Sequence, residues 1–252
     1  MRQLSLTTKV AILAMSVSRR QLLSTSLSHA LIAVVGTALI SSTPFAARSA
    51  AADAGFSFTP PAGRFIYTIT RDGDPIGTQK FDFVSDAANQ LTVITDVDID
   101  VRMLGLSFYK FTQHIEERWQ DGALQSILSQ TVDDGEQRQI DLVRKGDLLS
   151  GKYNNKKRSV VAGLIPSTLW HPDSVKQTTV LDTVRARQHQ VTVTDKGQVS
   201  LTLPSGQVDA RHYAFTGELN REVWYDTRGI IVQAEMIAKD GSIIRQQLLD
   251  RP

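Results

Sequence analysis

The stretch from Leu91 to Trp119 reads LTVITDVDIDVRMLGLSFYKFTQHIEERW, and it gives the strongest indication of the fold class. Up to Met103 apolar side chains alternate with polar ones, which is the period-two pattern of a half-buried β-strand. Leu104-Gly105-Leu106 then interrupts the pattern, and a second alternating run covers Ser107–Trp119. We therefore predict an antiparallel hairpin with a three-residue loop.

The register of this hairpin follows from its loop. Apolar residues face apolar residues on one side of the pair, and charged or polar residues face one another on the other side. The predicted pairs are Val101 with Tyr109, Ile99 with Phe111, Asp100 with Lys110, and Asp96 with His114. A slip by one residue would expose the apolar set, so the sequence specifies this register strongly.

Alternating runs continue on both sides of the hairpin and are separated by short turn sequences. The turns are Asp72-Gly73-Asp74-Pro75, Asp133-Asp134-Gly135, Asn154-Asn155, Asp195-Lys196-Gly197, Ser205-Gly206, Thr227-Arg228-Gly229 and Asp240-Gly241. The turn Asp195-Lys196-Gly197 is predicted to join two separate strands, Gln190–Thr194 and Val199–Leu203. We predict a single, mainly all-β domain over residues 64–252, a long antiparallel meander. More than about ten strands rarely stay flat, so a strongly curved sheet or open barrel is expected.

One segment departs from the β pattern. Pro166 and Pro172 bracket a short loop, and Asp173-Ser174 is a helix N-cap sequence. We predict one short inserted helix over residues 173–184, lying against a face or mouth of the curved sheet. Its buried side would consist of Val175, Val180, Leu181 and Val184.

Residues 1–52 are predicted to be an export signal. They contain five basic and no acidic residues, and Arg19 and Arg20 lie in a motif that resembles the twin-arginine signal. The apolar run Ala30–Ile40 is shorter than the roughly 20 residues of a membrane span. We expect the twin-arginine export machinery as a partner, cleavage near Ala52, and a periplasmic mature chain without a membrane span.

Two further expectations concern this end of the chain. Residues 53–63 contain Pro and Gly and are predicted to be a flexible arm. Met1 and Met15 are both possible translation starts, since a more ordinary signal begins at Met15.

The composition excludes several classes of function. The chain has 28 Lys and Arg, 26 Asp and Glu, and no Cys. Residues 53–252 hold 23 basic and 26 acidic residues, which does not favour nucleic-acid binding. Without Cys there is no disulfide, no thiolate metal site, no cysteine nucleophile and no acylated lipoprotein anchor.

Few residues carry a chemical signal, and we predict no catalytic residue, metal site or cofactor. His residues lack metal-ligand spacing, and no nucleophile elbow or phosphate-binding glycine loop occurs. The candidate ligand-binding residues are Trp170, His171, Asp173, Trp224 and Tyr225. The first three are either a ligand-contacting loop or a structural cap of the helix. Trp224 and Tyr225 are adjacent in a strand, so one is expected in the core and the other outside it.

Several motifs resemble an uncharacterised family of exported bacterial proteins, known only as a domain of unknown function. They are Tyr67-Thr68-Ile69, Asp74-Pro75-Ile76-Gly77, Thr168-Leu169-Trp170-His171-Pro172, Ala210-Arg211-His212-Tyr213, Gly217-Glu218-Leu219, Glu222-Val223-Trp224-Tyr225-Asp226, Gly229-Ile230-Ile231-Val232 and Lys239-Asp240-Gly241-Ser242. The chain is more distantly similar to half-barrel carriers of lipids or lipoproteins. The resemblance implies a fold and a location, and it transfers no catalytic residue.

Three functions follow as hypotheses. The first is non-enzymatic binding of an apolar ligand, such as a lipid or acyl chain, because curved sheets often enclose cavities. The second is a structural or protein-interaction module whose core is filled by Phe81, Phe83, Phe108, Phe111 and Trp119. The third is a hydrolase or isomerase that uses His171 and Asp173.

Overall fold

The computed structural model describes residues 58–86, 89–103 and 105–252. The predicted export signal, with Arg19, Arg20, Met1 and Met15, lies outside the described residues, as do residues 53–57 of the predicted arm. Within the described ranges, no helix is long and apolar enough to cross a lipid bilayer.

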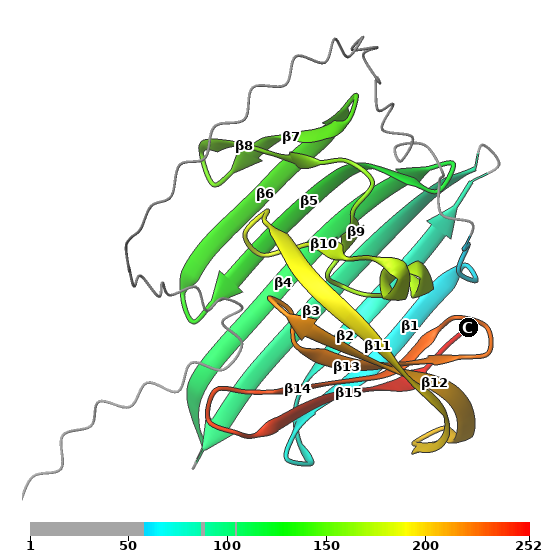
Figure 1. The fold of residues 1–252 in the computed structure, drawn as a ribbon. Coiled ribbons are helices and arrows are strands. Elements are labelled where there is room, and N and C mark those ends of the chain that lie inside the picture. The colour runs from blue at the N-terminus through cyan, green and yellow to red at the C-terminus, as the bar shows by residue number, and fades with distance from the viewer. Residues whose placement is uncertain (1–57, 87–88, 104) are drawn as a thin grey trace, which may run out of the picture.

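One sheet of fifteen strands makes up the described chain (Figure 1). The strands are β1 (Gly63–Arg71), β2 (Asp74–Ser85), β3 (Gln90–Met103), β4 (Leu106–Gln120), β5 (Ala123–Asp133), β6 (Glu136–Lys145), β7 (Leu148–Tyr153), β8 (Lys156–Val161), β9 (Ile165–Pro166), β10 (Thr179–Leu181), β11 (Gln188–Leu203), β12 (Gly206–Gly217), β13 (Arg221–Asp226), β14 (Ile231–Ile237) and β15 (Ile243–Asp250). Their order is β8-β7-β6-β5-β4-β3-β2-β1-β15-β14-β13-β12-β11-β10-β9, antiparallel except for the parallel pair β9 and β10. The mainly all-β fold class is confirmed.

The sheet curls without closing. β1 pairs with β15 in its middle, where Tyr67 lies opposite Leu248. The two edges, β8 and β9, follow each other in the chain with only residues 162–164 between them. Figure 1 shows β1–β6 as one broad twisted half and β11–β15 crossing in front of it. The predicted open curl is therefore confirmed. Segments on both sides of β10 reach its inner face, where Trp170 contacts Glu117 of β4 and the Thr183 carbonyl contacts Gln113 of β4.

Local turn chemistry explains the hairpins. Asp72 and Gly73, between β1 and β2, have φ angles of 50° and 98°, and Asp134 and Gly135, between β5 and β6, have 49° and 87°. Two consecutive left-handed residues make the type I′ turn, whose twist matches that of the flanking strands. Asp and Gly tolerate this conformation, so these sequences favour the turn. Both predicted hairpins are confirmed.

The register of β3 and β4 is also confirmed. Val101 pairs with Tyr109, Ile99 with Phe111, Asp100 with Lys110, and Asp96 with His114. Only the loop end of the hairpin differs from the prediction. The register shifts between Val101 and Arg102, so Met103 pairs with Leu106 and the loop has two residues. Such a bulge removes one residue from the ladder and allows a tighter turn, with Gly105 at a φ of 81°.

The predicted helix over residues 173–184 is wrong. Only a five-residue 3-10 helix, η1 (Pro172–Lys176), forms, and the chain then becomes extended in β10. There Val180 pairs with His189 of β11 on one side and with Ile165 of β9 on the other. The β-branched run Thr178-Thr179-Val180 fits this pairing better than a helix.

A second correction concerns residues 190–203, which form part of one strand, β11, instead of two. Both parts pair with β12, and the register shifts between Asp195 and Gly197. The Gly197 amide donates to the Asp195 carboxylate at 2.9 Å, and Gly197 has a φ of 92°. The Asp-Lys-Gly sequence therefore forms a bulge that bends the strand without reversing it.

Buried side chains form two core clusters inside the curl. The first contains Phe65, Phe81, Phe83, Trp119 and Trp170 among many others. The second, smaller cluster consists of Ile69, Ile76, Ile99, Val101, Tyr109, Phe111, Ala238 and Ile244. Phe108, which the filled-core hypothesis places inside, is 55% exposed because it faces away from its neighbour Tyr109 on β4.

Candidate functional site

Trp170 lies deep in the first core cluster, where it anchors a buried carboxylate. Its indole Nε1 donates to Glu117 Oε2 at 2.9 Å, and the indole Nε1 of Trp119 donates to the same oxygen at 3.0 Å. The Thr168 hydroxyl donates to Oε1 at 3.3 Å. Glu117 is 0% exposed, and burial raises the pKa of its carboxyl to about 7, although these hydrogen bonds oppose the shift.

His171 is buried beside Trp170 and caps η1. Its Nδ1 accepts a hydrogen bond from the Asp173 amide at 3.1 Å, and its ring stacks on that of Trp119 with 5.9 Å between centroids. Burial lowers the pKa of His171 to about 4, so the ring is neutral at pH 7. The Asp173 carboxylate lies 2.5 Å from Lys176 Nζ. His171, and not Asp173 as predicted, is thus the N-cap residue.

Trp224 and Tyr225 do not divide between core and surface as predicted, because both are buried, at 7% and 4% exposure. Trp224 stacks on His212, with 4.2 Å between ring centroids. On the opposite face, the Tyr225 hydroxyl donates to the Leu169 carbonyl at 2.7 Å. Side chains and backbone from other parts of the chain cover both faces of β13. The alternation of residues along a strand does not reveal this.

The predicted ligand-binding residues therefore do not converge on one place. Trp170 and His171 line a pocket of about 260 Å³ together with Phe58, Leu91 and Trp119. Tyr225 lines another, of about 410 Å³, beside Pro172 and Val175. Trp224 lines neither.

A polar belt crosses the interior between the two core clusters. Gln113 on β4 lies opposite Thr131 on β5, which lies opposite Arg138 on β6. Gln113 also donates to the Thr183 carbonyl at 3.0 Å, which joins the belt to the segment inside the curl. The belt consists of Gln79, Thr95, Gln113, Ser129, Thr131, Arg138, Ser167, Thr183, Arg221 and Gln246.

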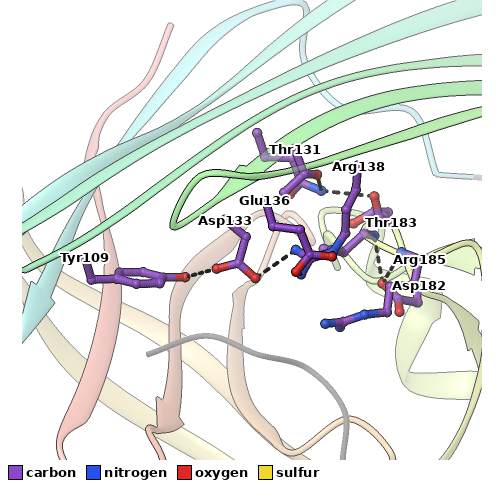
Figure 2. A network of polar contacts seen from close by, with 10 residues as sticks. Tyr109, Thr131, Asp133, Glu136, Arg138, Asp182, Thr183 and Arg185 are labelled. Atoms are coloured by element: carbon purple, nitrogen blue, oxygen red, sulfur yellow. Dashed lines mark hydrogen bonds and ion pairs between the residues drawn. The ribbon is translucent and has the colours of Figure 1, made fainter. Parts of the chain in front are cut away.

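One end of the belt is fully paired, as Figure 2 shows. Arg138 contacts Asp133 at 2.8 Å and Glu136 at 2.5 Å, and Asp133 accepts a hydrogen bond from the Tyr109 hydroxyl at 2.8 Å. The guanidinium is almost completely buried, and two carboxylates balance its charge. This part of the belt is a closed structural network.

The other end of the belt opens onto a cavity of about 90 Å³. Its apolar wall comes from the second core cluster and β14: Ile69, Ile99, Phe111, Ala234, Met236 and Ile244. Its polar wall includes Thr95, Arg221 and Gln246. Three buried atoms on this wall, Thr95 Oγ1, Arg221 Nε and Gln246 Nε2, have no hydrogen-bond partner among the described residues. Buried polar groups are normally paired, so this convergence marks the cavity as the candidate ligand site.

A larger groove of about 800 Å³ is a weaker candidate. Its lining is mostly exposed and polar, and it includes Lys80, Asp96, Asp98 and His114. Asp96 and His114 lie 2.7 Å apart, in the predicted cross-strand pair. Across the described ranges, no group of three or more His, Asp or Glu side chains is arranged to hold a metal ion.

The sequence contains a signal for part of the belt. On β4 the inward positions run Tyr109, Phe111, Gln113, Ile115, Glu117 and Trp119, so Gln113 and Glu117 break an apolar face. On β3, Thr95 breaks the apolar face in the same way. Polar residues at core positions of a strand indicate a buried network or a site. Arg221 had no such signal, because its burial depends on the packing of β13 across the curl.

Two solved structures resemble the curled sheet of this chain to different degrees. A β-barrel-like protein of domain of unknown function DUF1849 from Brucella abortus superposes with a TM-score of 0.56 at 16% sequence identity, covering 74% of this chain and 95% of that one. A protein with a YmcC-like fold from Bacteroides fragilis gives a TM-score of 0.35 at 9% identity, covering 77% and 97%. The first likeness is one of fold, and the second is too distant to carry an argument.

Comparison by sequence identifies the family. No curated protein matches the chain significantly. A family model described as "Domain of unknown function (DUF6134)" matches residues 67–249, which span every strand from β2 to β14 and most of β1 and β15. The resemblance to a family of unknown function is thereby confirmed, and the chain belongs to the DUF6134 family.

Proposed function

We propose that this protein is an exported, non-enzymatic binding protein that holds the apolar part of a small amphiphile inside its curled sheet. The observation that carries the proposal is the cavity between the polar belt and the second core cluster, with one apolar and one polar wall. Ligand pockets typically combine an apolar lining with a few convergent polar groups.

The cavity volume sets the size of the ligand. One water needs roughly 10–15 Å³ of such space, so about 90 Å³ holds several waters or a short aliphatic chain. A whole lipid needs several hundred Å³. Met236 and Gln246 are only partly buried, so the cavity communicates with solvent. A short acyl chain, or the end of a longer one, fits this arrangement.

The contacts around His171 favour a structural role over the alternative enzymatic one. Its Nδ1 accepts from the Asp173 amide, and the Asp173 carboxylate lies against Lys176. With its pKa lowered to about 4 by burial, the ring carries no charge at neutral pH. A general acid or base works best with a pKa near the working pH.

Native mass spectrometry of the protein as it is isolated from the envelope of the producing cell tests the proposal. We expect a retained mass of amphiphile size that organic extraction releases. Ala234→Leu adds three carbon atoms to a buried residue of the cavity wall, and it should abolish the retained mass because it fills the space the ligand needs. The mass of the chain itself should correspond to a start near Asp53, as export with cleavage requires.

Ala123→Leu is the matched control, because Ala123 lies at the start of β5 and does not line the cavity. It should retain the ligand. A clean ligand-free mass for the parent chain from its own envelope would contradict the proposal. That result would favour the alternative of a structural or protein-interaction module.

A further inference from the structure

Arg221 carries an unbalanced charge inside the protein. Arg221 is half-buried, but its Nε atom is buried and has no hydrogen-bond partner among the described residues. Its Nη2 contacts the Met236 sulfur at 3.4 Å. Burial lowers the pKa of its guanidinium, and no carboxylate of the described residues forms an ion pair with it. Guanidinium groups nevertheless stay protonated in proteins. Arg138, the fully buried arginine of the belt, has two carboxylate partners.

The carboxylate in the lining of the cavity, Glu235, already has hydrogen-bond partners. Glu235 accepts hydrogen bonds from Arg245 Nε at 2.6 Å and from Gln233 Nε2 at 2.9 Å. Water in the cavity can satisfy a hydrogen bond of Arg221, but it cannot balance the charge. A buried charge without a counter-charge destabilises the folded protein.

Two further donors face the same cavity. Gln246 Nε2 is a donor only, and the Thr95 hydroxyl can donate or accept. Together with Arg221 Nε they give the polar wall one formal positive charge and three unused hydrogen-bonding groups. An anionic oxygen group matches this set, whereas a cation or an apolar end does not.

We propose that the ligand of the cavity is an amphiphile with a carboxylate head, which binds Arg221 while its aliphatic chain lies against the second core cluster. This inference rests on the proposed function and adds the chemical class of the ligand. Gln246 and Thr95 complete the binding of the carboxylate oxygens. The aliphatic chain contacts Ile69, Ile99, Phe111 and Ile244.

Isothermal titration of the chain, purified from the producing cell and stripped of bound organic molecules, tests the head group. Octanoate and 1-octanol have the same chain length and differ in charge. We expect octanoate to bind at least tenfold more tightly, about 1.4 kcal/mol, because a charge-assisted hydrogen bond forms only with the carboxylate. Methyl octanoate, which has the oxygens without the charge, should bind like octanol.

Arg221→Met separates the head-group role from a structural one. It should lower octanoate affinity at least tenfold, change octanol affinity less than threefold, and raise the Tm of the ligand-free protein. A structural arginine would lower the Tm on removal, whereas an uncompensated buried charge raises it. Arg211→Met is the matched control, because Arg211 is exposed and pairs with Asp195. It should leave both affinities unchanged.

The outcomes are distinguishable. Equal affinity of the parent chain for octanoate, methyl octanoate and octanol would overturn the carboxylate inference and leave the proposed cavity in place. An equal loss of octanoate and octanol binding in Arg221→Met would also overturn it. Absence of binding for all three compounds would overturn both the inference and the proposed function. If Arg221→Met does not fold, the comparison of the three compounds on the parent chain still tests the carboxylate inference.

Discussion

Glu117→Gln is expected to gain about 3 kcal/mol of stability relative to the parent chain as the pH rises from 4.5 to 7. In the folded chain the pKa of Glu117 is about 7, against 4.5 for the ordinary group. Between these values the folded state keeps a proton that the unfolded chain loses. The parent chain therefore loses stability as the pH rises through this window, and the glutamine variant does not.

His171→Asn should show the opposite trend. The pKa of His171 is about 4 in the folded chain, against 6.5 for the ordinary group. Between these values the unfolded chain takes up a proton that the buried ring does not. The parent chain thus gains stability as the pH rises from 4 to 6.5. The variant should lose about 3 kcal/mol relative to the parent over that range. Asparagine keeps an acceptor for the Asp173 amide that His171 Nδ1 binds.

Urea unfolding at pH 4, 5, 6 and 7, followed by tryptophan fluorescence, measures both effects. Trp119 and Trp170 contact both groups and report directly on this cluster. The double variant Glu117→Gln/His171→Asn should run nearly parallel to the parent, because the two opposing slopes are removed together. A single variant whose stability profile runs parallel to the parent would show that its group does not titrate abnormally.

The second large effect is expected for Gly77→Ala, which should destabilise the protein by about 3 kcal/mol or more. Gly77 of β2 lies opposite Ile99 of β3 in the middle of the sheet. A Cβ at this position would lie 2.1 Å from the Asp98 carbonyl oxygen and 2.9 Å from the Ile99 Cα. Both are backbone atoms, so the two strands must separate to admit the methyl group.

Gly73→Ala is the matched control for this prediction. Gly73 has a φ of 98°, and no atom lies within 4 Å of an added Cβ. The change therefore costs only the strain of a left-handed backbone, roughly 1–2 kcal/mol. Denaturant titration of the two variants compares them directly. The explanation by steric contact fails if Gly77→Ala is no less stable than Gly73→Ala.

The sequence predicted the hairpins because their determinants are local. The turn Asp72-Gly73 and the alternation in β3 and β4 act over a few residues, so register and turn type could be inferred without the rest of the chain. The predicted turn at Asp195-Lys196-Gly197 is wrong because local residues alone do not specify the structure there. A turn and a bulge use the same residues, and only pairing with β12 distinguishes them.

The site was less accessible to prediction. The structure places the five predicted site residues in separate environments. They are Trp170, His171, Asp173, Trp224 and Tyr225, and all are aromatic or titratable. The cavity instead depends on residues from distant strands. Thr95, Arg221 and Gln246 are at least 25 positions apart in the chain. Their convergence requires the curl that brings β13 and β15 over β3.

Period-two alternation and Asp-Gly turns act over neighbouring residues, so they are sufficient to predict a meander of antiparallel strands with apolar and polar faces. Three other features depend on tertiary contacts. These are the pairing of β1 with β15, the extended conformation of Thr179–Leu181, and the meeting of Arg221 with the second core cluster. Each depends on contacts between residues far apart in the chain, and burial by those contacts sets both the conformation of a segment and the charge environment of a side chain.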